Sequence, residues 1–331
     1  MSASMLKFFP GIAAIVFILS CPGRYSIAQP PRQEVGETIA DRPSKHYRFE
    51  QFRVSSPDGE RHWRVHLAIP RAAVPQTGFP SFWMLDGNAA LMDLDSALLE
   101  KLGAQTVPLA LVFLSHESEF RIDSAARYRD YTPTRMPTEI DGPIQNLTGG
   151  ADALLELIER TIRPQVHKRV QLDSEDQTLW GHSLGGVFVL HTLFTRTGAF
   201  QNYVAGSPSM WWGKGVPAIE AQRFALHNAG HAVNAAIHVG GREQGGGSRA
   251  TRGINNPRVS AMLELRRSVP PDAAKQLVAD LEGVGKLQVT YREFPELDHG
   301  EMFRASLVGG LCAAAGIEEP GDIAANDAIA R

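Results

Sequence analysis

Short apolar runs alternate with helix-like segments over most of this chain, and this alternation constrains the fold more than any other feature. Residues 82–85 and 109–114 are continuous apolar runs, and the helix-like segment 89–103 lies between them. Runs of this length are typical of parallel strands that are buried on both faces. Further strand-like segments (177–180, 235–239, 287–294) and helix-like segments (187–194, 258–267, 273–281, 301–314) continue the alternation. The pattern predicts one α/β domain with a mostly parallel central sheet and helices on both faces.

An antiparallel pair is expected to open the domain. Residues 46–54 and 62–69 have strand character, and Trp63, Val65 and Leu67 fall on one face of the second segment. The sequence Pro-Asp-Gly between the two segments favours a turn. We therefore expect a hairpin at the edge of the parallel sheet.

The N-terminal part has the pattern of a secretory signal. Lys7 precedes an apolar run at 12–19, and small residues at 26 and 28 favour cleavage after Ala28. The run is shorter than the roughly 20 residues that span a bilayer. The alternative is a lipoprotein signal ending at Cys21, which would anchor the protein to a membrane.

These patterns divide the chain into four parts and indicate a periplasmic or secreted protein. We expect a signal peptide at 1–28, a flexible Pro-rich linker at 29–45, the α/β domain at 46–316 and a polar C-terminal tail at 317–331. A membrane contact is expected only if Cys21 is lipidated.

Charge and cysteine content exclude several classes of protein. The 33 Lys and Arg against 36 Asp and Glu give a formal net charge of −3, with no block of like charge that would indicate nucleic-acid binding. Cys21 and Cys312 are too few for a disulfide framework and lack the spacing of a zinc site. We expect no metal, no cofactor and no nucleic-acid partner.

Residues 181–185 match the pattern Gly-x-Ser-x-Gly. In this pattern a serine stands on a sharp turn between a strand and a helix, and glycines allow the close approach of the backbone. The context agrees, because a strand-like segment ends at Trp180 and an apolar helix-like segment follows Gly185. The motif predicts that Ser183 is a nucleophile.

A serine hydroxyl needs a base, and His299 is the best of the 11 histidines. It follows the last predicted strand, and hydrolases with this motif have the chain order serine, acid, histidine. Glu243 follows the strand at 235–239 and is the leading candidate for the acid that orients the histidine. Asp298 is the alternative candidate for the acid, and a Ser-His dyad without an acid is the third possibility.

Two backbone amides are candidates for stabilising an oxyanion. One belongs to Leu184, directly after the nucleophile, and the other to Asn88, in the loop after the strand at 82–85.

The sequence resembles an esterase family of the α/β-hydrolase superfamily, and within it the periplasmic esterases that linearise the siderophores enterobactin and salmochelin. The resemblance extends from about residue 46 to residue 311. It rests on MLDGNA at 84–89, Arg127 with DYTP at 130–133, WGHS at 180–183 with Gly185 and Gly186, AGSPS at 205–209, and HG at 299–300 with MF at 302–303. One departure is Leu184, which stands where these esterases tend to have an aromatic residue.

The resemblance implies an α/β-hydrolase fold and cleavage of siderophore trilactone esters by Ser183 and His299. The partner would then be a small-molecule ester, a ferric or apo siderophore. The family places the Arg127 block beside the active site, where a cation could bind a catecholate or carboxylate. A structural ion pair between Arg127 and Asp130 is the alternative.

Other functions stay open at this stage. Wider relatives act on acyl, feruloyl or acetyl esters, and an acyltransferase would use the same residues with an alcohol in place of water. A non-catalytic module that binds a siderophore or glycan is disfavoured by the intact motif, the late histidine and the candidate acid.

Overall fold

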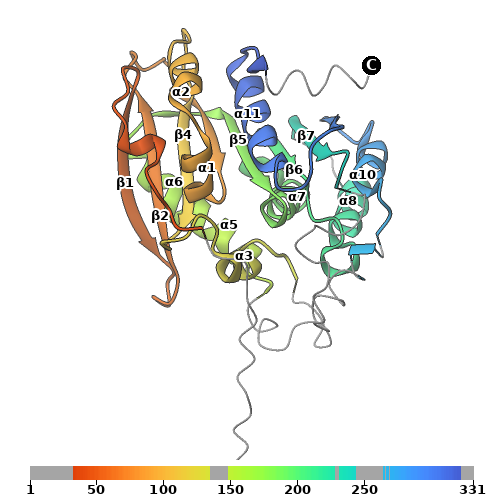
Figure 1. The fold of residues 1–331 in the computed structure, drawn as a ribbon. Coiled ribbons are helices and arrows are strands. Elements are labelled where there is room, and N and C mark those ends of the chain that lie inside the picture. The colour runs from red at the N-terminus through yellow and green to blue at the C-terminus, as the bar shows by residue number, and fades with distance from the viewer. Residues whose placement is uncertain are drawn as a thin grey trace, which may run out of the picture. The chain divides into compact units, whose positions relative to one another are not determined.

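One sheet runs through the protein, and its strands follow the order β1-β2-β4-β3-β5-β6-β7-β8 (Figure 1). The structure is a computed structural model that describes residues 33–134, 148–227, 231–243, 264, 266–267 and 269–321. The strands are β1 (Tyr47–Ser55), β2 (His62–Pro70), β3 (Phe79–Met84), β4 (Ala110–His116), β5 (Leu172–His182), β6 (Asn202–Gly206), β7 (Val233–Gly240) and β8 (Leu287–Phe294).

The pairing of the strands is mixed, as the sequence predicts. β1 pairs with β2 and β2 pairs with β4 in antiparallel fashion. β3 is parallel to β4 and β5, and the sheet continues in parallel through β6, β7 and β8. This arrangement confirms the α/β prediction with an antiparallel N-terminal pair. The carboxyl ends of the parallel strands therefore lie at one edge of the sheet, where α/β proteins place their sites.

Helices cover both faces of the sheet (Figure 1). Side chains alternate across β3, so that Phe82 and Met84 belong to one buried cluster and Trp83 belongs to the other. The first cluster lies under α1 (Gly87–Asp93), α2 (Ser96–Gly103) and α11 (Met302–Ala315). The second lies under α5 (Ala151–Leu157), η3 (Ile158–Ile162), α6 (Arg163–His167), α7 (Leu184–Thr195), α8 (Val216–His227) and α10 (Ala273–Leu281).

Several elements differ from the sequence prediction. The segment 89–103 forms two helices, because Asp95 caps α2 by accepting a hydrogen bond from the Leu98 amide at 2.8 Å. β6, α8 and the helical stretch α5–η3–α6 were not predicted. The long connection 115–150 contains the helix α3 (Ser124–Asp130), and its residues 135–147 lie outside the described part. Of the predicted helix 258–267, only residues 264, 266 and 267 are described, and they are helical.

The described residues 33–45 depart from the expectation of a flexible linker. Glu34 forms an isolated β-bridge with Phe120, and Ile39 is buried against the sheet. Ile39 begins a short 3-10 helix, η1 (Ile39–Asp41), which Thr38 and Asp41 close with a capping box. The Val35 amide also donates to the Glu119 carbonyl oxygen at 2.8 Å, so backbone bonds and one buried apolar side chain connect this segment to the domain.

The other predicted terminal features fall mainly outside the described residues. These include the proposed signal at 1–28, with Cys21, and the tail from residue 322. Helix α11 ends with Gly316 in the left-handed region, at φ 63°. Among the described residues, no helix has the length and apolar character needed to cross a membrane.

Candidate active site

Ser183 occupies a sharp, strained turn between β5 and α7. Its φ of 61° and ψ of −113° are unusual for a residue with a side chain. A Cβ atom at Gly181 would lie 2.5 Å from the Gly185 carbonyl oxygen, and one at Gly186 would lie 2.9 Å from the Cα of Pro208. A Cβ at Gly185 would make only ordinary contacts, the nearest at 3.6 Å. The close approach that keeps this turn tight therefore occurs at Gly181 and Gly186.

A continuous chain of hydrogen bonds joins the three residues predicted as nucleophile, base and acid. The Ser183 Oγ lies 3.0 Å from His299 Nε2, and His299 Nδ1 lies 2.9 Å from Glu243 Oε2. The second carboxylate oxygen of Glu243 accepts from the Gly240 amide at 2.7 Å and from the Ser207 hydroxyl. Each residue follows a different strand, β5, β7 or β8, at the same edge of the sheet.

Asp298 lies next to His299 in sequence but has another role. Its Oδ1 accepts hydrogen bonds from the amides of Gly300, at 2.8 Å, and Glu301, at 3.0 Å. These contacts stabilise the turn that leads into α11. The carboxylate that faces the imidazole is therefore that of Glu243.

His182 is a feature of the site that sequence reasoning did not single out. Its ring centroid lies 4.8 Å from that of His299 and 5.5 Å from that of Phe303. Burial, with smaller contributions from the neighbouring His299 and Arg127 side chains, holds the pKa of His182 well below its usual value. A neutral imidazole thus packs against His299. Its position as the residue before Ser183 in the motif was the signal available in the sequence.

The two residues expected to supply oxyanion donors each lie in the first turn of a helix. Leu184 is the first residue of α7, and Asn88 is the second residue of α1. Amides in a first helical turn have no acceptor within their own helix. The side-chain amide of Asn88 is used elsewhere, because it donates to the carbonyl oxygens of Ser118 at 3.1 Å and Phe120 at 3.0 Å. Only its backbone amide is then a candidate.

Comparison of the chain with known proteins identifies its family. The family model described as "Putative esterase" matches residues 55–266. Apo-salmochelin esterase of Escherichia coli O6:H1 is 31% identical over 300 residues, which make up 88% of each chain. The chain belongs to this esterase family. It is accordingly a member of a family of carboxylic ester hydrolases.

Other matches agree with this assignment. The siderophore enterobactin esterase of Emericella nidulans is 32% identical over 247 residues, 69% of this chain and 80% of that protein. The solved structure of the enterobactin and salmochelin hydrolase IroE superposes with a TM-score of 0.65 at 28% identity, over 84% of this chain and 99% of that one. These esterases and the present one share the α/β-hydrolase-like fold.

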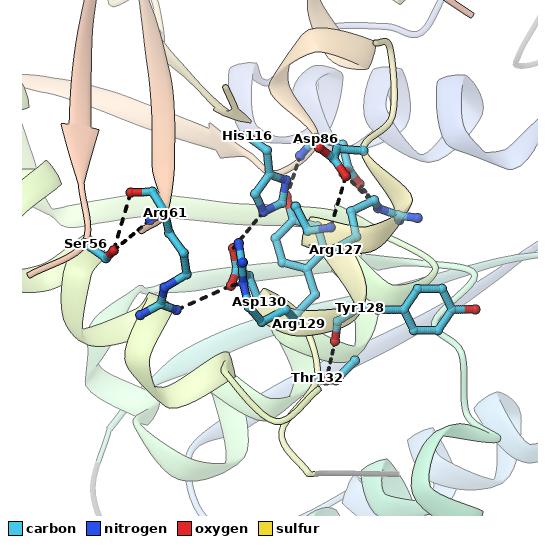
Figure 2. A network of polar contacts seen from close by, with 12 residues as sticks. Ser56, Arg61, Asp86, His116, Arg127, Tyr128, Arg129, Asp130 and Thr132 are labelled. Atoms are coloured by element: carbon cyan, nitrogen blue, oxygen red, sulfur yellow. Dashed lines mark hydrogen bonds and ion pairs between the residues drawn. The ribbon is translucent and has the colours of Figure 1, made fainter. Parts of the chain in front are cut away.

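In this esterase the ion-pair partner of Arg127 is Asp86. The sequence had indicated a substrate anion or Asp130 as the partner. The Arg127 Nε lies 2.8 Å from Asp86 Oδ1 (Figure 2). Its Nη2 donates to the His182 carbonyl oxygen at 3.1 Å. The side chain of Arg127 is only 12% exposed and that of Asp86 only 2%. The predicted pair with Asp130 does not form, and the positive charge is already balanced inside the protein.

Asp130 instead anchors the helix that carries Arg127. Its fully buried carboxylate contacts His116 Nε2 at 3.0 Å, Arg129 Nε at 2.8 Å and Arg61 Nη1 at 3.5 Å (Figure 2). Burial would raise the pKa of Asp130, but the hydrogen bonds from His116 and Arg129 hold it below the usual value. This charged cluster fixes α3 against β2 and β4.

The esterase presents no obvious place for a metal among the residues described. Within those ranges no three or more His, Cys, Asp or Glu side chains gather into a group that could hold an ion. Cys312 is buried in α11, and burial raises its pKa to about 11.

Proposed function

We propose that this esterase hydrolyses siderophore esters through an acyl-enzyme on Ser183, with His299 as general base and Glu243 as the residue that orients it. The observation that carries the proposal is the continuous contact Ser183 Oγ–His299 Nε2–Glu243, at 3.0 and 2.9 Å. Such a chain supplies what a serine nucleophile needs: a base within reach, held in the correct tautomer.

The geometry supports a two-step reaction. His299 Nε2 accepts the Ser183 proton while Oγ attacks the ester carbonyl carbon, and the Leu184 and Asn88 amides are the candidate donors to the oxyanion. The C–O bond to the alcohol breaks, and the leaving oxygen takes the proton from His299. Water then attacks the acyl-enzyme with His299 again as base, which releases the carboxylic acid and restores Ser183.

The Glu243 contacts favour a triad over a dyad. Its carboxylate is only 19% exposed and is held by the Gly240 amide and the Ser207 hydroxyl, so one oxygen is fixed toward the His299 ring. A carboxylate in this position stabilises the imidazolium that forms during the reaction.

The relatives, and not Arg127, support the proposed substrate class. Several relatives are named as esterases of siderophores, among them the apo-salmochelin and ferri-bacillibactin esterases. Because Asp86 already balances the charge of Arg127, we do not assign substrate recognition to that side chain. The proposed substrate is a siderophore with ester-linked units, in apo or ferric form.

The test compares a catecholate trilactone such as enterobactin with a simple p-nitrophenyl ester. Wild-type protein should linearise the trilactone, as followed by liquid chromatography and mass spectrometry, and should react with a fluorophosphonate probe. Ser183→Ala should abolish both activities with an unchanged circular dichroism spectrum, and turnover above about a tenth of wild type would reject the nucleophile.

The same assay separates the alternatives. Cleavage of p-nitrophenyl esters without trilactone cleavage would indicate a general acyl, feruloyl or acetyl esterase. Transfer of the acyl group to an added alcohol in preference to water would indicate an acyltransferase. A wild-type protein that neither turns over an ester nor reacts with the probe would be a binding module.

A further inference from the structure

The residues after β6 run directly alongside the nucleophile. The Ser183 amide donates to the Gly206 carbonyl at 2.8 Å, and the Ser209 amide donates to the Ser183 carbonyl at 3.1 Å. Ser207, between them, adopts a positive φ of 41°, and its amide bonds the His238 carbonyl at 2.7 Å. Two backbone bonds to Ser183 therefore fix this segment in place, and the buried Ser209 side chain has a defined position.

The Ser209 hydroxyl reaches the reacting atom itself. Its Oγ lies 3.2 Å from the Ser183 Oγ. His299 Nδ1 needs a proton for its bond to the Glu243 carboxylate, so in the neutral imidazole that acts as base Nε2 has no proton and accepts the one from Ser183. In that arrangement the Ser183 oxygen can only accept from Ser209, and Ser209 is the donor.

We propose that Ser209 is a further catalytic residue, a hydroxyl that donates to the Ser183 oxygen whenever negative charge develops there. The proposal rests on the proposed function. A separation of 3.2 Å is long for a hydrogen bond between hydroxyl groups, so the contact contributes little in the resting protein. The hydrogen bond from Ser209 becomes stronger when the Ser183 Oγ carries negative charge. Only interactions that are stronger in the transition state than in the ground state accelerate a reaction.

Charge develops on this oxygen twice in each cycle. In the first step Ser183 loses its proton to His299 as the bond to the carbonyl carbon forms. In the last step the bond between that carbon and Oγ breaks, the electron pair stays on Oγ, and His299 returns the proton. Ser209 donates a hydrogen bond in both steps and keeps its own proton throughout.

The experiment measures Ser209→Ala with a p-nitrophenyl ester and with a fluorophosphonate probe. We expect kcat and the probe-labelling rate to fall together by about 10- to 100-fold, the effect of losing one donor to a developing charge. KM should change little, because the lost contact is to the protein's own nucleophile. A kcat and labelling rate within about twofold of wild type would overturn the proposal.

Two further variants control for structural effects. Ser81→Ala removes another buried hydroxyl, which accepts from the Trp83 indole at 3.0 Å on β3, and should leave kcat unchanged. Ser209→Cys keeps the shape of the side chain with a weaker donor and should lower kcat severalfold. If Ser209→Ala does not fold, this variant decides the question, and a wild-type rate for Ser209→Cys would overturn the role.

Failure of this proposal is distinct from failure of the proposed function. If wild-type protein shows neither ester turnover nor labelling, the serine hydrolase itself is rejected. If wild-type protein is active and Ser209→Ala equals it, only the role of Ser209 is rejected.

Discussion

Arg127 and Asp86 form an ion pair of 2.8 Å that connects the end of β3 to the turn that carries the nucleophile. Asp86 stands at the start of α1 in the left-handed conformation, and its amide donates to the Tyr131 hydroxyl at 3.1 Å. Arg127 also bonds the carbonyl of His182, one residue before Ser183. The two loops that carry the candidate oxyanion amides are thus held to each other through one guanidinium group.

Because of this relationship, we predict that a change at Arg127 lowers the activity on all substrates by the same factor. Arg127→Lys keeps the charge but cannot hold Asp86 and the His182 carbonyl together, so kcat should fall by about 10- to 100-fold through misplacement of the two loops. The loss should be the same for neutral p-nitrophenyl acetate and for an anionic catecholate trilactone, as measured by steady-state kinetics.

The control is Arg160→Ala, which removes a highly exposed arginine that forms an ion pair with Glu156 and should leave both activities unchanged. If Arg127→Lys loses trilactone cleavage but keeps p-nitrophenyl acetate hydrolysis, Arg127 contacts the substrate after all.

Glu243→Gln tests the triad. A glutamine amide facing His299 Nδ1 favours the wrong imidazole tautomer, with a proton on the nitrogen that must accept from Ser183. We expect kcat to fall by about 10³- to 10⁴-fold. Asp298→Asn is the matched control and should retain most activity, because the Asp298 carboxylate accepts from the backbone amides of Gly300 and Glu301 and an asparagine oxygen can do the same. A loss below about tenfold for Glu243→Gln would support a dyad.

His66 should make the protein less stable in weak acid. Burial, with a contribution from Arg64, lowers the pKa of His66 in β2 to about 4, below the value of about 6.5 in an unfolded chain. Between these pH values the unfolded state binds more protons than the folded state. The folded state with a neutral His66 therefore has its full stability above pH 6.5 and loses part of it as the pH falls toward 4. The loss should be roughly 1–3 kcal/mol in the free energy of unfolding.

Urea unfolding at pH 7.5 and pH 5 measures this effect. His66→Gln should reduce the difference between the two pH values, whereas His62→Gln, at the exposed start of the same strand, is the control. An identical pH dependence for His66→Gln and wild type would contradict the assignment.

If the protein is exported, its signal peptide should be removed and the mature N-terminus should differ from Met1. Protein purified from its native host should begin near Gln29, as mass spectrometry of the intact chain would reveal. A diacylated Cys21 would establish the lipoprotein alternative, and a retained Met1 in a cytosolic fraction would exclude secretion.

Most of the strands could be predicted from the sequence. The segments 273–281 and 287–294 match α10 and β8 at both ends, because amphipathic periodicity and strand alternation are local properties. The Gly-x-Ser-x-Gly turn is recognisable for the same reason. β6 has only five residues, and a strand this short gives too little periodicity to be predicted.

Which charged and polar groups meet depends on the packing of the whole chain. Arg127 pairs with Asp86, 41 residues away, and not with Asp130, three residues away. Glu243 reaches His299 from another strand, whereas the adjacent Asp298 turns toward backbone amides. Strand order and register set these contacts, and neither can be read from spacing along the chain. In the same way, Ser209 lies beside Ser183 because β6 pairs with β5.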